Sequence, residues 1–210
     1  MLVLASASPR RRDLLTQAGF AFEVVTASVN EDVHPGERPI GYVLRLAREK
    51  AEAVAASQEF QALARRSPEP PILLGADTTV VAPNGEILGK PEDDADAARM
   101  LRLLAGATHQ VITGVAVLVP QADISEVAAE VTHVTMLTPS DEDIDRYIAT
   151  GETHGKAGAY AIQGRAARWI PRVHGCYFNV VGLPLALVTS MIEAVELRLR
   201  SGVTSQIVVP

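Results

Sequence analysis

The chain has 210 residues, of which 48% are hydrophobic, and a formal net charge of −6. This length and hydrophobicity allow a large buried core, as one domain or two small lobes, and the acidic balance argues against a protein that binds nucleic acid or membranes through broad basic patches. A single cysteine, Cys176, excludes an intramolecular disulfide and predicts a cytoplasmic location. No segment is long and uncharged enough to predict a membrane span.

The N-terminal segment predicts two strands and two helices. Residues 2–6 are apolar and indicate a buried strand, and "SPRRRDLLTQAG" follows with Ser8 as the N-cap, a proline at the first helical position and Gly19 as the stop. A second strand is expected over residues 22–26, before the acidic loop "SVNEDVHPGERP". Apolar residues at helical spacing then predict a helix over residues 40–57.

The rest of the chain alternates strands and helices. After the Pro-rich loop "RRSPEPPI", residues 72–82 predict a buried strand that turns back at "PNGE". A capped helix is expected in "DDADAARMLRLLAG", with Gly106 as its stop, and two long strands over residues 109–120 and 124–137. Helices are expected in "TPSDEDIDRYIAT" and from about residue 183 to 200. With no repeat and no linker, this order predicts one continuous α/β or mixed α+β body.

A cluster of polar side chains directly follows the first predicted strand: Ser6, Ser8, Arg10 and Arg11. Proteins of the α/β class bind ligands where strands end. A helix N-terminus offers free N–H groups, serine hydroxyls donate, and arginine supplies a planar fork, so the cluster suits a phosphate. A capped surface helix with solvated arginines fits the same spacing, and the spacing leaves both interpretations open.

Two acidic residues are candidate metal ligands. Asp77, followed by Thr78, interrupts a strand that is apolar on both sides, where an ionised carboxylate is costly unless it binds a cation or lies at the edge of a cleft. A structural, hydrogen-bonded aspartate is the alternative. Glu31 in the acidic loop is a second oxygen ligand or a solvated side chain. Because the 5 histidines lack zinc-ligand spacing, carboxylates beside phosphate favour Mg²⁺ or Mn²⁺.

Three lysines extend the candidate site. Lys90 follows "ILG", Lys50 lies on the apolar stripe of its predicted helix, and Lys156 lies among the glycines of "GKAGAY". Small residues let a phosphate approach the backbone, which makes Lys156 a phosphate-binding candidate. Lys50 can equally be a lysine that extends to solvent from the edge of its helix.

A series of segments resembles, in order, the motifs of the Maf family of nucleoside triphosphate pyrophosphatases: "LASASPRRRDLL", "RLAREKA", "GADTTVV", "LGKPEDDADAARMLRLLAG", "HQVITGVAV", "GKAGAYAIQG" and "NVVGLP". The resemblance covers nearly the whole chain and implies a single domain over residues 1–210. It implies a mixed, twisted α/β sheet flanked by helices, with two lobes around a deep cleft, related to inosine triphosphate pyrophosphatases. It also implies that water attacks the α-phosphate of a nucleoside triphosphate, with a divalent cation, giving a monophosphate and pyrophosphate.

The resemblance also implies roles for individual residues. Asp77 matches the aspartate that acts as proton acceptor in the family. The positions that cluster around the phosphates and the metal match Ser6, Arg11, Glu31, Lys50 and Lys90. Lys156 is added to the expected phosphate-binding residues because glycines surround it. Glu31 and Asp77 form the expected metal site. Arg12 matches no functional position, so we expect it to be a solvated helix residue.

Three positions bear on the substrate. Arg10, Thr78 and Gln163 match the branch that resembles dTTP/UTP pyrophosphatases, whereas the branch acting on 7-methyl-GTP has Trp, Gln and Glu there. An amide can both donate to and accept from the edge of uracil or thymine, while a glutamate suits the donor-rich edge of a methylated guanine. The resemblance therefore implies dTTP and UTP, or modified pyrimidine nucleotides, as substrates.

Two alternatives in function stay open: hydrolysis of 7-methyl-GTP or inosine triphosphate, and a non-hydrolytic regulator of septum formation. The expected partner is a nucleoside triphosphate, with neither nucleic acid nor membrane. The last helix and the apolar tail "IVVP" could serve a homodimer, and a disordered end fits the tail equally well.

Overall fold

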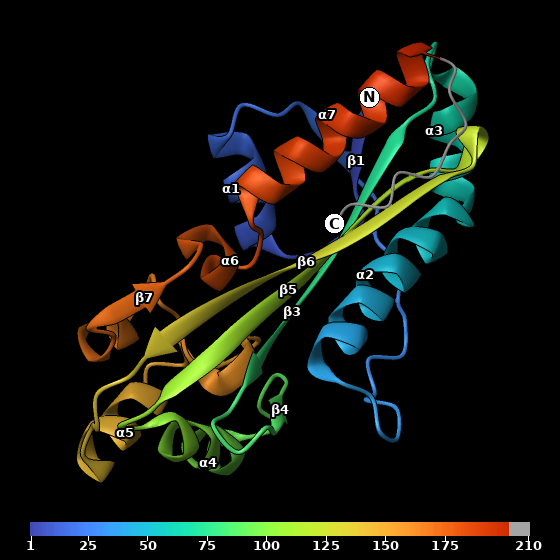
Figure 1. The fold of residues 1–210 in the computed structure, drawn as a ribbon. Coiled ribbons are helices and arrows are strands. Elements are labelled where there is room, and N and C mark those ends of the chain that lie inside the picture. Colours follow the sequence, from blue (N-terminus) through green and yellow to red (C-terminus); the bar gives the residue numbers. More distant parts are fainter. Residues whose placement is uncertain (202–210) are drawn as a thin grey trace.

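A mixed sheet of seven strands runs through the computed structural model, which describes residues 1–201 (Figure 1). The strands are β1 (Leu2–Leu4), β2 (Phe22–Val24), β3 (Ile72–Val81), β4 (Ile87–Leu88), β5 (Thr108–Val119), β6 (Ile124–Thr135) and β7 (Arg172–His174). Their order is β2-β1-β3-β5-β6-β7, with β4 beside β3. β1 pairs in parallel with β2 and β3, and the other pairs are antiparallel. The predicted mixed α/β sheet is confirmed.

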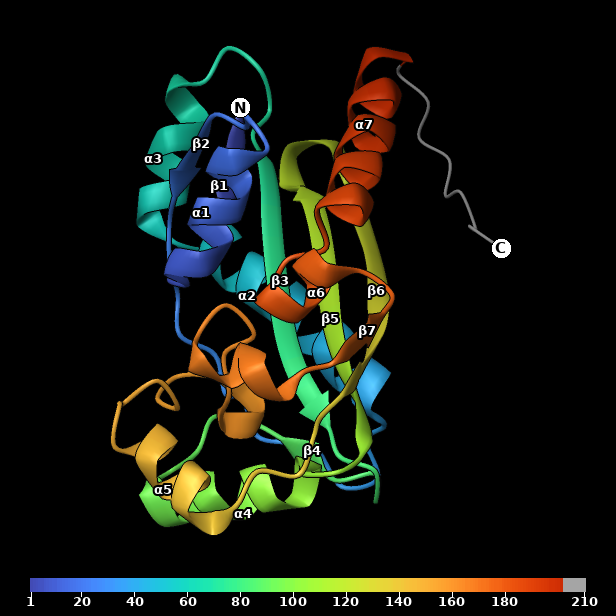
Figure 2. The same cartoon turned by 90° about the vertical axis from the view of Figure 1, so that its left-hand side faces the viewer.

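Helices cover both faces of this sheet (Figures 1 and 2). They are α1 (Pro9–Gln17), α2 (Pro39–Ala55), α3 (Gln58–Arg66), α4 (Asp94–Leu104), α5 (Asp141–Ile148), α6 (Tyr177–Val181) and α7 (Leu185–Ser201), with the 3-10 turns η1 (Pro120–Ala122), η2 (Ala157–Ala159) and η3 (Arg165–Trp169). Among these helices, none combines the length and the low polarity that crossing a bilayer demands. The apolar tail considered for a homodimer lies outside the described residues.

The hydrophobic core divides along the length of the sheet. At one end, α1 and α7 pack on one face of the sheet and α2 and α3 on the other. At the opposite end, α4 and α5 pack with η2 and η3 in a separate cluster that includes Tyr147 and Trp169. The long strands β3 and β5 contribute to both ends. The molecule therefore has two lobes that share one sheet, as predicted.

Two glycines let α2 lie unusually close to the sheet. A Cβ atom on Gly75 would lie 2.2 Å from the carbonyl oxygen of Ala47, and one on Gly114 would lie 2.2 Å from that of Val43. Both oxygens belong to the backbone of α2, so no side chain fits at either position without moving the helix. This close packing brings Lys50, at the same face of α2, over the middle of β3.

The middle of β3 has a free edge, and this edge positions the candidate site. β1 pairs with β3 only at residues 72–74, and β4 pairs only with Val80 and Val81. Residues 75–79 therefore have no strand on this side. Because side chains alternate between the faces of a strand, Asp77 faces α2 while Thr78 faces α1.

A buried histidine gives the fold a predicted pH dependence. His109 Nε2 shares a 2.8 Å hydrogen bond with Tyr160 Oη, while its Nδ1 has no partner within residues 1–201. Burial lowers the pKa of His109 to about 4. An unfolded histidine titrates near pH 6.5, so between about pH 6.5 and 4 the unfolded state binds more protons than the folded state.

We therefore expect the free energy of unfolding to be fully retained above pH 6.5 and to fall by about 2 kcal/mol from pH 7 to pH 5. Urea denaturation at both pH values measures the change, and His109→Gln should remove most of it. An equal pH dependence in the wild type and the variant would show that this histidine is not the cause.

Candidate active site

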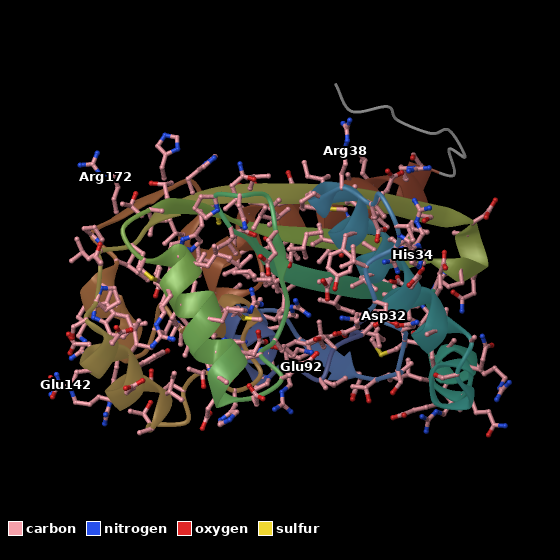
Figure 3. The ribbon with its side chains drawn as sticks, turned by 90° about the horizontal axis from the view of Figure 1, so that it is seen from below. Asp32, His34, Arg38, Glu92, Glu142 and Arg172 are labelled. Carbon is pink, nitrogen blue, oxygen red and sulfur yellow. The ribbon has the colours of Figure 1, made fainter. Side chains whose placement is uncertain are left out.

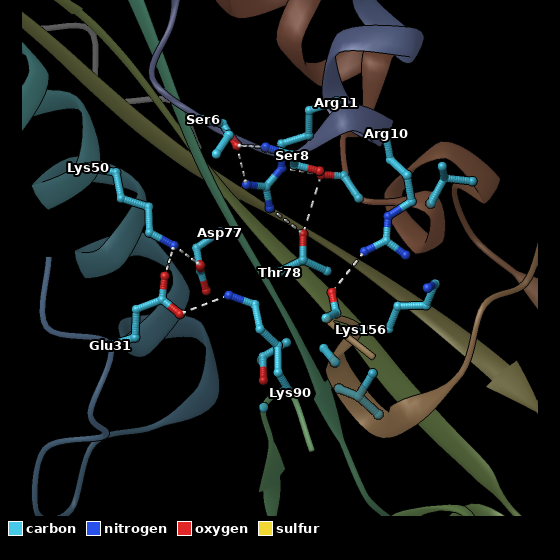
Figure 4. A pocket seen from close by; sticks show the side chains of 18 of the residues that line it. Ser6, Ser8, Arg10, Arg11, Glu31, Lys50, Asp77, Thr78, Lys90 and Lys156 are labelled. Carbon is cyan, nitrogen blue, oxygen red and sulfur yellow. Dashed lines mark hydrogen bonds and ion pairs between the residues drawn. The ribbon is translucent and has the colours of Figure 1, made fainter. Parts of the chain in front are cut away.

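A cleft of about 650 Å³ opens at the free edge of β3, between the two lobes (Figure 4). Its walls come from the end of β1, the start of α1, the acidic loop, α2, β3 and the segments around Lys90 and Lys156. It gathers most of the site residues predicted from the sequence, namely Ser6, Ser8, Arg10, Arg11, Glu31, Lys50, Asp77, Thr78, Lys90 and Lys156. Side chains from distant parts of the chain thus meet in one cavity.

One wall of the cleft carries two carboxylates bound to the same ammonium group. Lys50 Nζ lies 2.6 Å from Asp77 Oδ1 and 2.7 Å from Glu31 Oε1, and Lys90 Nζ lies 3.3 Å from Glu31 Oε2. Burial opposes ionisation of Glu31, but the hydrogen bond and charge of Lys50, with the charge of Lys90, outweigh it and hold its pKa below the usual value. The Glu31 carboxylate therefore stays ionised beside that of Asp77.

This pair fits a divalent cation. Mg²⁺ binds through one or two carboxylates and takes its remaining ligands from water and substrate phosphates. Glu31 and Asp77 supply two such hard oxygen ligands, and each places a carboxylate oxygen within 2.7 Å of the same Lys50 ammonium nitrogen. Residues 1–201 contain no cluster of three or more acidic, histidine or cysteine side chains that would suit a metal bound by protein alone. The donor set therefore suits a cation shared with phosphate.

Arg11 supports the wall of the cleft next to Asp77 (Figure 4). Its Nε donates to the Gly182 carbonyl at 2.8 Å, its Nη1 to the Ala76 carbonyl at 2.8 Å and to Ser6 Oγ at 3.2 Å, and its Nη2 to Thr78 Oγ1 at 3.0 Å. The residue is buried, which lowers its pKa despite the nearby charge of Asp77. Most of its donors are thus used inside the protein, leaving a single N–H for a ligand.

The Ala76 carbonyl explains why an arginine is needed in this wall. It lies where β3 pairs with β5 on one side but has no strand on the side of β1, and a buried carbonyl without a partner is unfavourable. The neighbouring Leu74 carbonyl accepts instead from the Ala5 N–H at 2.8 Å. The Arg11 side chain therefore donates to the Ala76 carbonyl of β3, as the backbone after β1 donates to the Leu74 carbonyl.

Thr78 belongs to a polar network that the sequence did not reveal. Its hydroxyl bonds to Thr113 Oγ1 at 2.9 Å, and Thr113 reaches the Asn179 carbonyl at 3.4 Å. The buried Asn179 amide donates to the Val111 carbonyl and to Thr132 Oγ1, both at 2.9 Å. This network ties α6 to the sheet. In the sequence, its only signals are Thr113, a polar residue within the apolar run "HQVITGVAV", and Asn179, just before "VVGLP".

Arg10 and Lys156 face each other across the other side of the cleft. Arg10 Nη2 contacts the Gly155 carbonyl at 3.4 Å, and Lys156 Nζ contacts the His154 carbonyl at 3.3 Å. Burial lowers the pKa of both groups, and the charge of Arg10 lowers that of Lys156 further. Within residues 1–201, each of these neighbouring cations is hydrogen-bonded only to a backbone carbonyl, which favours a negatively charged ligand between them. Arg12, in contrast, is exposed and does not line the cleft, as expected.

A strained turn holds Lys156 in place. Gly158 has φ +67° and lies against Val80, where a Cβ would come within 2.9 Å of that side chain. The next residue, Ala159, is fully buried with φ +59°, a conformation that costs free energy for an alanine. The Gly158 N–H donates to the Gly89 carbonyl at 3.0 Å. The segment that carries Lys156 is therefore linked to the one that carries Lys90.

Gln163 is the predicted site residue that the structure does not bring to the cleft. It is exposed and lies just before η3, outside the residues that line the cavity. The turn that follows it is held by Glu152 Oε2, which accepts a 2.8 Å hydrogen bond from the Arg165 N–H. Recognition of the base by Gln163 stays a prediction.

Known proteins resemble this chain over most of its length. Residues 1–195 match the family described as "Maf-like protein". A "dTTP/UTP pyrophosphatase" of Koribacter versatilis (strain Ellin345) is 50% identical, covering 91% of this chain and 93% of the relative, and one of Pelotomaculum thermopropionicum is 49% identical, covering 91% and 95%. Among solved structures, the Staphylococcus aureus Ham1 protein matches with a TM-score of 0.42 and 15% identity, covering 92% of this chain and 98% of that one.

Proposed function

Because the chain belongs to the Maf family, we propose that it is an enzyme that hydrolyses dTTP and UTP to the nucleoside monophosphate and pyrophosphate. The observation that carries this proposal is the cleft itself, where the carboxylates of Glu31 and Asp77 converge on one side and Arg10 and Lys156 meet on the other. Relatives that share about half of their residues with this chain are named for the same reaction.

In the proposed reaction, Asp77 accepts a proton from the attacking water. The water oxygen forms a bond to the α-phosphorus, the bond to the bridging oxygen between the α- and β-phosphates breaks, and pyrophosphate leaves. Glu31 and Asp77 would hold Mg²⁺ or Mn²⁺, which supplies charge neutralisation and a more acidic water. Lys50 and Lys90, with the last free N–H of Arg11, stabilise the negative charge on the phosphates.

Ser6 and Ser8 complete the phosphate site in this proposal. Ser6 Oγ accepts from the Ser8 N–H and from Arg11, both at 3.2 Å, and its own O–H remains available to donate into the cleft. The Ser8 side chain makes no capping hydrogen bond to α1, although Ser8 is the N-cap residue. Both hydroxyls are therefore free to bind an anion at the start of this helix.

We also propose that residues 1–210 act as one domain, because β3 and β5 belong to both lobes. The nucleotide substrate and the single, partly buried cysteine are consistent with action in the cytoplasm. A homodimer through α7, where Leu197 is 68% exposed, is part of the proposal. Light scattering on the purified protein measures the oligomeric state directly.

A panel of nucleotides tests the proposed function. The purified protein is incubated with dTTP, UTP, 7-methyl-GTP and inosine triphosphate in the presence of Mg²⁺ or Mn²⁺, and released pyrophosphate is converted to phosphate and quantified. We expect the highest kcat/KM for dTTP and UTP. Preferred turnover of a purine nucleotide would support the first alternative, and nucleotide binding without turnover would support a non-hydrolytic regulator.

A single substitution tests the predicted role of Gln163 in specificity. Gln163→Glu should lower kcat/KM for dTTP relative to 7-methyl-GTP by roughly tenfold, the value of one lost hydrogen bond to the base. The matched control is Gln121→Glu, which makes the same change at an exposed position on η1. An unchanged ratio in the Gln163 variant would mean that other groups read the base.

A further inference from the structure

The loop that carries Glu31 has little to hold it in place. It runs from residue 25 to residue 38 without regular secondary structure, and most of its side chains are exposed. A long exposed loop has many conformations available, and fixing one of them has an entropic cost. Yet Glu31 must lie next to Asp77 for the two carboxylates to share a cation. Some part of the scaffold must therefore restrain the backbone near Glu31.

Two side chains of α2 provide this restraint. Tyr42 Oη donates to the Glu31 carbonyl at 2.9 Å, and Arg45 Nη2 donates to the Asp32 carbonyl at 3.0 Å. The carbonyls of two successive loop residues are thus bound by one face of one helix. Figure 3 shows the loop beside α2, with Asp32 and His34 labelled. Because Lys50 also lies on α2, the helix fixes both Glu31 and its ion-pair partner.

Glu37, near the end of the same loop, fixes Arg45 in turn. Arg45 Nε and Nη2 each lie 2.7 Å from one oxygen of the Glu37 carboxylate, a bidentate pairing. The two side chains are only 18% and 13% exposed, so this pair is better shielded from water than an ordinary surface ion pair. Glu37 Oε2 also accepts from the His34 N–H at 3.0 Å. The hydrogen bond from Arg45 lowers the pKa of Glu37 to about 2, so the pair stays ionised at neutral pH.

We propose that Arg45, acting with Glu37 and Tyr42, is a positioning residue that holds Glu31 at the metal-binding carboxylate pair. Arg45 and Glu37 do not line the cleft, so they act through the loop and not on the substrate. The proposal rests on the proposed function of the cleft, since it assumes that Glu31 serves there as a ligand.

The first test compares two arginines of the same helix. In Arg45→Ala we expect kcat/KM for dTTP to fall and the half-saturating Mg²⁺ concentration to rise, each by roughly tenfold, as for other residues that orient metal ligands. Arg48→Ala, at an exposed position of α2, should change neither value. Arg45→Lys should recover part of the loss, because lysine keeps the charge but cannot form the bidentate pairing.

Amide hydrogen exchange tests the restraint without relying on activity. Residues 26–38 should exchange faster in Arg45→Ala than in the wild type, while β3 and β5 keep their protection. Unchanged exchange in this loop would overturn the proposal. If the wild type releases no pyrophosphate from dTTP, the proposed function fails instead, and the exchange result still decides whether Arg45 restrains the loop.

A double-mutant cycle establishes whether Arg45 acts through Glu31. The quantity measured is the affinity for Mn²⁺ in the presence of α,β-methylene-dTTP, which is not hydrolysed. Glu31→Gln and Arg45→Ala should each weaken Mn²⁺ binding, and the double variant should bind no more weakly than Glu31→Gln alone. Independent, multiplying losses would contradict the proposal, because Arg45 would then affect the metal by another route.

Discussion

Asp77→Asn should reduce pyrophosphate release from dTTP by about 10³-fold while the protein remains folded. The amide has nearly the same shape as the carboxylate but cannot accept the proton of the attacking water. Its oxygen can still accept a hydrogen bond from Lys50, which lies 2.6 Å from Asp77 in the wild type. Lys50 also keeps its second partner, Glu31. The loss should therefore appear in kcat and not in the melting temperature.

The matched control for this substitution is Asp13→Asn, which removes the same charge from an exposed position on α1. Steady-state kinetics and thermal unfolding are measured for both variants. Asp13→Asn should behave as the wild type in each assay. If Asp77→Asn turns over dTTP at a rate near that of the wild type, Asp77 is not the proton acceptor and the assignment is wrong.

Arg11→Met should lower the free energy of unfolding by roughly 3–5 kcal/mol and also lower turnover. Methionine keeps much of the apolar stem but removes the donor to the Ala76 carbonyl, and it leaves the Gly182 carbonyl with only the longer, 3.4 Å contact from Thr78 Oγ1. Thr78 and Ser6 lose a partner as well. The wall of the cleft therefore loses the side chain that ties β1, β3 and the segment after α6 together, in addition to one phosphate contact.

Arg12→Met, at the neighbouring exposed position, is the control and should cost little stability. Chemical denaturation measures both variants, and turnover is assayed at a temperature at which both are folded. An Arg11→Met protein as stable as the wild type would show that the hydrogen bonds of Arg11 do not support the wall of the cleft.

The regular elements of the fold follow from local patterns. The apolar strand β3, the long strands β5 and β6, the stripe of α2 and the capped starts of α4 and α5 all carry strong sequence signals, and the structure confirms them. The sequence pattern did not predict α3 as a separate helix, because its N-cap, Ser57, falls at the end of the helix expected over residues 40–57. The short elements β7 and α6 depend on contacts with β6 and the sheet, which no local pattern reveals.

Sequence patterns predicted which polar and charged side chains line the cleft, but not which backbone groups those side chains bind. The polar residues that follow apolar strands line one cleft, and their roles there stay predictions. The bracing role of Arg11 was not predictable, because its main acceptors are backbone carbonyls 65 and 171 residues away. Arg45 appeared in the sequence only as part of a helical motif, since its partners lie in a loop without periodicity. Its role therefore needed the three-dimensional structure.

Hydrolysis of dTTP in water enriched in ¹⁸O is the most direct test of the proposed reaction. Attack of water on the α-phosphorus places the labelled oxygen in dTMP and leaves the released pyrophosphate unlabelled. The wild-type protein should therefore give singly labelled dTMP and unlabelled pyrophosphate by mass spectrometry, and Asp77→Asn should give neither above background. Label in pyrophosphate or in free phosphate would place the attack at another phosphorus and contradict the mechanism proposed for this cleft.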